Sequence, residues 1–224
     1  PSDVRFESSG IRVLNARGQN LWTWGFPCPS VDSLSRWVLD NLDDDREREL
    51  AFLLNTPQSS PCSVNAALYV IDHDGREISH QSAKILGEYP GDTSASTPYT
   101  AAGLTVLDFG SKKRIMTAVT DSYPARGHIR FWTSEGEPTG WYVSAGFPAN
   151  IDHEYILLND GECICISGYN NRMGGAASLF VLPVDSAFGC APPYVDSLYD
   201  LSWVKRGCQS VYVLFPRTDL SVAY

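Results

Sequence analysis

The alternation of apolar runs and turn-forming residues along the chain predicts short strands joined by tight turns. Between Gly127 and Ser167, β-branched and aromatic residues form runs interrupted by glycine, proline or asparagine. The strands predicted in this stretch span residues 127–133, 141–145, 155–158 and 163–167. Asn159-Asp160-Gly161 separates the last two, and Asp-Gly is a strong hairpin signal because both residues tolerate a positive φ. A second such turn, Asp72–Gly75, lies between predicted strands at 66–71 and 76–79.

The same alternation of apolar runs and turn-forming residues continues through the rest of the chain, where the secondary structure of one segment is ambiguous. Further strands are predicted at 4–7, 10–15, 103–109, 114–120, 178–184, 198–204 and 210–215. In 33–55, the apolar positions fit one face of a helix, but they fit two strands at 36–42 and 49–54 equally well. The β-rich surroundings favour the strands. With no repeat or linker, residues 1–224 are predicted to form one all-β domain, an antiparallel β-sandwich or squashed β-barrel with hairpins and little helix.

Several predicted strands are apolar on both faces, which a two-layer sandwich does not explain. A sheet with one face in water should alternate apolar and polar residues. The exceptions are 66–71, 155–158, 179–182 and 211–215. Such strands need cover on both sides, so the pattern predicts either a third layer or a partner subunit, most simply in a homodimer.

Composition narrows the possible partners. A length of 224 residues suits a single sandwich or barrel, and the chain has no apolar run of about 18 residues, so membrane insertion is not expected. The net charge of −9 and pI near 4.8, without a basic stripe, argue against nucleic-acid binding. Because the chain starts at Pro1 without a methionine, we expect a fragment or a processed product.

Six cysteines allow two interpretations. They are Cys28, Cys62, Cys163, Cys165, Cys190 and Cys208. An even number could form three disulfides. However, Cys163 and Cys165 stand two positions apart on one strand face, where they rarely bond to each other, and the chain has no N-glycosylation sequon. Free thiols and assembly in a reducing compartment are therefore favoured.

The sequence contains no G-x-S-x-G, H-E-x-x-H, C-x-x-C or phosphate-binding glycine motif, and no catalytic, metal or cofactor site is predicted. The acidic run Asp43-Asp44-Asp45 lacks the ligand spacing of a calcium loop. His73 between Asp72 and Asp74 sits in a tight turn whose three side chains are not expected to converge on one ion. Each segment is interpreted as a solvated turn. A hydrolase on a jelly-roll-like scaffold is the least favoured of the functions considered.

A binding surface is predicted on the outer loops, chiefly Glu88–Thr100, because loops on a rigid sheet often carry function. Its tyrosines offer flat apolar faces, and its polar side chains suit a hydroxyl-rich ligand. The turns at Asn170–Arg172 and Glu135–Gly140 are possible neighbours. The predicted site residues are Tyr89, Asp92, Thr93, Ser94, Ser96, Tyr99, Asn170, Asn171 and Arg172. A merely mobile loop is the alternative. Trp22 with Trp24 is the second choice of site, although the aromatic segment there favours core or interface packing.

The segment Arg126–Pro183 resembles the second half of the protruding domains of small non-enveloped RNA viruses. The resemblance lies in RGHIRFW, GWYVSAGFP, EYILLNDGECICISGY and NNRMGGAASLFVLP, in that order. It is similar to the hepatitis E virus capsid protrusion and closer to the astrovirus capsid spike, of the avian (turkey) type. The resemblance implies a dimeric all-β spike without catalysis or cofactor. It implies contact with the capsid shell through the N-terminus, host-cell attachment through a glycan or protein receptor, recognition by neutralising antibodies, and assembly in the host cytoplasm. A stand-alone β-sandwich lectin is the alternative function.

Overall fold

The chain folds into antiparallel sheets, as expected from the sequence. The computed structural model describes residues 1–27, 36–43, 45–55, 66–83, 99–109, 112–121, 127–144, 155–158, 161–170, 176–184, 187 and 211–215. Every element of four or more residues in these ranges is a strand, and all strand pairs are antiparallel. The prediction of an all-β fold with hairpins and little helix is confirmed for this part of the chain.

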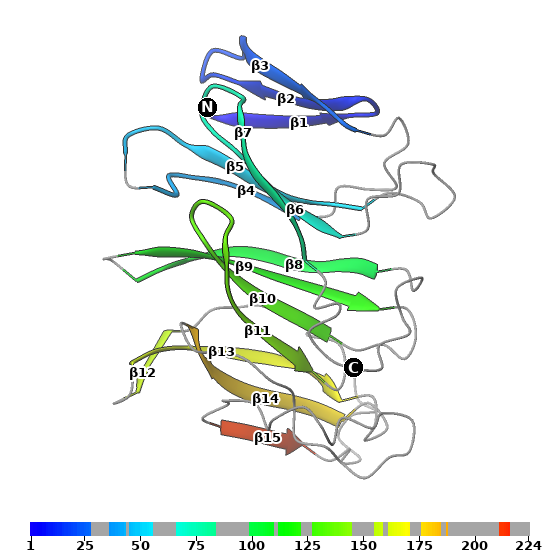
Figure 1. Cartoon of the computed structure of the whole chain (residues 1–224), viewed down its shortest axis with the longest axis vertical. Coiled ribbons are helices and arrows are strands. Elements are labelled where there is room, and N and C mark those ends of the chain that lie inside the picture. Colours follow the sequence, from blue (N-terminus) through cyan, green and yellow to red (C-terminus); the bar gives the residue numbers. More distant parts are fainter. Residues whose placement is uncertain are drawn as a thin grey trace.

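The strands form four sheets, which stack in chain order (Figure 1). The first sheet contains β1 (Asp3–Glu7), β2 (Gly10–Leu14) and β3 (Asn20–Gly25). The second contains β4 (Arg36–Asp40), β5 (Glu49–Leu54), β6 (Ala67–Ile71) and β7 (Glu77–Ser82). The third contains β8 (Tyr99–Asp108), β9 (Lys113–Asp121), β10 (Gly127–Thr133) and β11 (Pro138–Ser144). The fourth contains β12 (Tyr155–Leu158), β13 (Gly161–Asn170), β14 (Ala176–Pro183) and β15 (Val211–Phe215).

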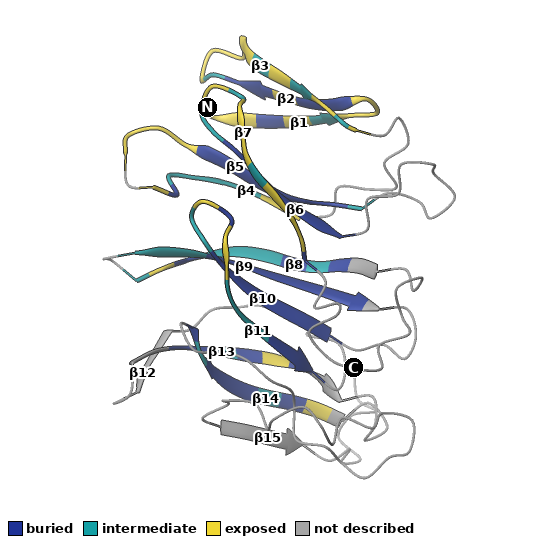
Figure 2. Cartoon of the chain, in the orientation of Figure 1, coloured by how far each residue is buried: buried dark blue, intermediate teal, exposed yellow. Residues whose placement is uncertain are grey.

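Three hydrophobic clusters fill the spaces between the four sheets. Alternate residues of β5 face opposite layers: Phe52 packs toward the first sheet and Leu53 toward the third. In β10, Trp132 packs toward the second sheet and Phe131 toward the fourth. Figure 2 shows the central strands of the two inner sheets, β5 and β6 in the second and β9 and β10 in the third, as largely buried, whereas β7 at the edge of the second sheet is mostly exposed. The two-sided apolar strands of the second sheet are thus covered by further layers of the same chain, and they no longer argue for a partner subunit.

The ambiguous segment forms β4 and β5, so the preferred two-strand interpretation is confirmed. All six residues of β5 are buried. A helix in this position would expose part of that run, whereas a strand between two packed layers buries both of its faces. The strand predicted at 198–204 lies outside the described residues.

Buried polar side chains link the second and third sheets. Arg130, on β10, donates from Nη1 to the carbonyl oxygen of Ser82 at 3.2 Å, and its guanidinium lies 5.3 Å from the ring centre of Trp132. Trp132 Nε1 in turn donates to Thr117 Oγ1 at 2.9 Å. At the strand end where β9 begins, Lys113 Nζ donates to the carbonyl oxygen of Asn41. The Arg130 and Lys113 bonds cross from the third sheet to residues of the second sheet and its β4 end, whereas the Trp132–Thr117 bond lies within the third sheet. Each bond satisfies a donor that would be costly to bury unpaired.

The turn between β10 and β11 reaches back to the second sheet. Gly136 has a φ of +80°, and a Cβ placed on it would lie 2.0 Å from Ser79 Oγ on β7. A register shift between Phe131 and Trp132 marks a bulge in the hairpin, and bulges bend strands. The hairpin therefore rests its tip against β7 (Figure 1).

Two of the six cysteines lie in described strands. Cys163 is buried and Cys165 is half-buried, both on β13, and they do not bond to each other. This agrees with the expectation for two cysteines on one strand face. Cys28, Cys62, Cys190 and Cys208 lie outside the described residues, so the wider prediction of free thiols stays a prediction.

Candidate functional site

The structure locates two of the predicted binding residues. Tyr99 begins β8, where it pairs with Asp121, and Asn170 ends β13, where it pairs with Ala176. Both strand ends lie on the right-hand side of the stack in Figure 1. The other predicted residues lie outside the described ones: Tyr89, Asp92, Thr93, Ser94, Ser96, Asn171 and Arg172.

The turn at Glu135–Gly140 is not a neighbour of Tyr99. Across the third sheet, Gly127 pairs with Thr120 beside the start of β8, whereas Thr133 pairs with Arg114 at the other end. The seven residues of β10 separate these two ends, a distance of about 20 Å at 3.3 Å per residue. The sequence could not show this separation, because it depends on the strand register.

The aromatic residues of β3 belong to the core and not to an exposed binding surface. The Trp24 ring centre lies 5.4 Å from that of Phe52 and 5.1 Å from that of Tyr69, in edge-on contacts between the first and second sheets. Trp22 is half-buried, and its Nε1 donates to the carbonyl oxygen of His73 at 2.7 Å. The packing interpretation of this segment is confirmed.

A group of potential metal ligands lies at one end of the second sheet. Asp45, Glu49 and His73 each offer a ligand atom, and these atoms lie within 4.8 Å of one another. Pairing of Leu50 with Ile71 brings the start of β5 beside the end of β6. The connection that leads into β5 and the turn that follows β6 therefore meet at one edge.

Glu49 is the buried member of this group. Its side chain is 2% exposed, and Oε2 accepts a hydrogen bond from Leu42 N at 2.6 Å. Oε1 is buried without a hydrogen-bond partner among the described residues. Burial raises the pKa of Glu49 above its ordinary value of 4.5. The Leu42 bond opposes this shift, and the charges of Asp43 and Asp45 add to it.

Asp45 and His73 stand nearer to solvent. Asp45 is exposed, and its Oδ1 accepts from Glu47 N at 2.5 Å. The side chain of His73 is 39% exposed, and its Nε2 lies 3.5 Å from Asp74 Oδ2. An ion could therefore reach the group from solvent, with Glu49 at its inner side.

The sequence identified both turns but not their convergence. The Asp72–Gly75 turn forms as predicted: Asp72 Oδ1 accepts from the backbone N of Asp74 at 2.9 Å and of Arg76 at 2.8 Å, and Gly75 has a φ of +84°. The Asp72 carboxylate therefore accepts hydrogen bonds within its own turn, whereas the His73 side chain lies near Asp45 and Glu49 of the β4–β5 connection. The sequence did contain one indication of this site: Glu49 is an acidic residue at the first position of a strand that is otherwise apolar.

Comparison with known proteins does not place the chain in a family. No protein-family model matches it, and neither the curated proteins nor the solved structures include a significant match. Among the described residues, no helix has the length and apolar character needed to cross a membrane.

Proposed function

We propose that the chain is a capsid spike that projects from a non-enveloped virus and attaches the virion to a host-cell receptor. The observation that supports the proposal is that strands of the segment with spike-like sequence share one hydrophobic core. Arg126–Pro183 contains β10 to β14, and Phe131, Tyr142 and Phe180 from these strands meet in one core cluster between the third and fourth sheets. A sequence resemblance over strands that pack together supports the proposal more strongly than one scattered over elements that do not touch.

The receptor surface is proposed at the side of the stack where β8 begins and β13 ends. Four packed sheets make a rigid support, and loops at strand ends of such supports carry binding residues more often than the strands do. The proposed contacts are those of residues 88–100, the last two of which belong to β8 and not to the predicted loop, and those of Asn170–Arg172. Tyrosine and small polar side chains would suit either a glycan or a protein receptor.

The proposed assembly is a homodimer on the virion surface, joined to the capsid shell through the N-terminus and assembled in the host cytoplasm. This part rests on the sequence resemblance and on the prevalence of closed two-fold pairs. Light scattering at micromolar concentration should give about twice the chain mass of 24.7 kDa. A monomer over the whole concentration range would favour the stand-alone lectin instead.

Cell attachment by the isolated domain tests the proposed surface. The triple variant Tyr89→Ala/Asp92→Ala/Tyr99→Ala should reduce attachment at least tenfold, which corresponds to about 1.4 kcal/mol of binding free energy. Glu135→Ala/Glu137→Ala is the control, because both acids are exposed and lie at the opposite end of the third sheet. Equal attachment by the wild type and a folded triple variant would refute the assignment. Removing cell-surface glycans before the assay separates a sugar receptor from a protein receptor.

A further inference from the structure

We infer that Asp45, Glu49 and His73 bind a divalent metal ion of intermediate softness, with Zn²⁺ as the best fit. Their chemistry selects the ion: calcium and magnesium take oxygen ligands, whereas an imidazole nitrogen combined with carboxylates suits zinc and its neighbours. Three protein ligands leave one position of a tetrahedral ion for water or another group. The inference is independent of the proposed attachment function.

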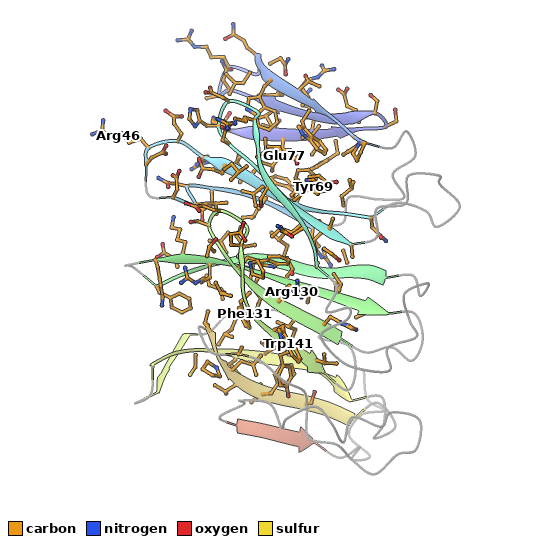
Figure 3. The ribbon with its side chains drawn as sticks, in the orientation of Figure 1. Arg46, Tyr69, Glu77, Arg130, Phe131 and Trp141 are labelled. Atoms are coloured by element: carbon orange, nitrogen blue, oxygen red, sulfur yellow. The ribbon has the colours of Figure 1, made fainter. Side chains whose placement is uncertain are left out.

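The unpartnered oxygen of Glu49 is the observation that points to a ligand. Glu49 is 2% exposed, and within the described part of the chain its Oε1 has no hydrogen-bond partner and its carboxylate forms no ion pair. A buried carboxylate is expensive unless it is paired, protonated or bound to a metal. Arg46, in the same connection, extends away from the stack (Figure 3). A metal ion beside Oε1 would therefore supply the positive charge that the described side chains do not.

The geometry needs only small side-chain movements. A tetrahedral ion with ligands at about 2.0–2.1 Å holds the ligand atoms about 3.4 Å apart. Because the atoms of Asp45, Glu49 and His73 already lie within 4.8 Å of one another, no pair has to approach by more than about 1.4 Å to reach that spacing. Asp45 and His73 project from turns, where rotamer changes disturb no strand pairing.

Asp74 and Trp22 support the histidine from outside the proposed ligand set. Metal-bound imidazoles commonly donate their second N–H to a carboxylate, and Asp74 Oδ2 lies 3.5 Å from His73 Nε2. Trp22, on the first sheet, donates a hydrogen bond from Nε1 to the carbonyl oxygen of His73 at a distance of 2.7 Å. A bound ion would thus tie the β4–β5 connection to the β6–β7 turn and, through Trp22, to the first sheet.

The test is metal binding by the full chain after treatment with a chelator. Calorimetric titration with ZnCl₂ should show one saturable site per chain, and the melting temperature should rise with zinc concentration, since an ion that binds only the folded state stabilises it. His73→Gln and Glu49→Gln should each weaken this site tenfold or more, as loss of even an outer-shell partner commonly costs 10- to 100-fold. CaCl₂ and MgCl₂ should bind more weakly than ZnCl₂.

His80→Gln is the matched control. His80 is an exposed histidine on β7 whose Nδ1 contacts Glu77 Oε1 at 2.5 Å, outside the proposed site. All these variants keep the six cysteines, so the thiols are alkylated in every protein before the titration and the one-to-one site is counted without them. Equal zinc affinity in wild type and His73→Gln, or the absence of a one-to-one site, would overturn the inference. If Glu49→Gln does not fold, the zinc affinity of His73→Gln still tests the inference, because His73 lies on a half-exposed turn where the substitution should not disturb folding.

Discussion

Replacing Gly136 by alanine tests how the third sheet contacts the second. At a φ of +80°, any L-residue pays the left-handed backbone strain, and the new Cβ would also lie 2.0 Å from Ser79 Oγ and 3.2 Å from Val70 Cγ2. The strain amounts to about 1–2 kcal/mol, offset by about 0.4–1 kcal/mol because alanine restricts the unfolded chain. Overpacking against Ser79 adds about 1–3 kcal/mol. The net destabilisation expected for Gly136→Ala is about 2–4 kcal/mol.

Gly18→Ala separates backbone strain from the contact between the sheets. Gly18 has a φ of +75°, but nothing lies within 4 Å of the position its Cβ would take. It should therefore lose only about 1 kcal/mol, the balance of strain and unfolded-state restriction. For a domain of this length, each kcal/mol corresponds to about 2–4 °C in melting temperature.

Urea or thermal unfolding of four proteins completes this test: the two glycine variants, Ser79→Ala and Ser79→Ala/Gly136→Ala. Removing Ser79 Oγ leaves the Ser79 Cβ at 3.3 Å from the new methyl group, so most of the overlap disappears. The double variant should recover about 1–3 kcal/mol relative to the sum of the single changes. If Gly136→Ala and Gly18→Ala cost the same, or the two changes are additive, the turn does not rest on β7.

Three further outcomes are expected. Phe131→Ala leaves a cavity at a fully buried site between the third and fourth sheets and should lower the free energy of unfolding in urea by about 3–5 kcal/mol. Leu21→Ala is the control, because Leu21 is 46% exposed, and it should change that free energy by no more than about 0.5 kcal/mol. Equal losses in the two variants would contradict the assignment of the layers. Burial, with a smaller contribution from Glu77, raises the pKa of Tyr69 above 10.0. The folded state therefore retains the proton, and stability should fall as the pH rises from about 10 toward the raised pKa. Tyr69→Phe should lose less stability in that range, and an unchanged alkaline profile would be the contrary result. Thiol titration of the denatured, unreduced protein should detect at least four titratable thiol groups. Finding none would remove the argument for assembly in a reducing compartment.

The sequence by itself indicated most of the described strands and several of their connections, although β3 was not among the strands predicted from it. Local patterns act over a few residues, so the Asp-Gly turn at Asp72–Gly75 and the strand 127–133 were accessible without tertiary information. The predicted strand 66–71 is apolar on both faces, so the sequence also indicated that other residues must pack against both faces. A strand with one face in water would carry polar residues on that face. Whether that cover came from the same chain or from a partner was left open.

Only the tertiary structure decided which layers and turns meet. Stacking the first sheet on the second and the second on the third supplied the missing cover within the chain. The third-sheet register placed Glu135–Gly140 far from Tyr99. It was the antiparallel pairing of β5 with β6 that brought Asp45 and Glu49 to His73. Each turn forms through interactions among its own residues, so neither segment shows in its sequence which other segment it will contact. The contact between the two turns depends on long-range strand pairing, which the alternation of apolar and polar residues constrains but does not specify.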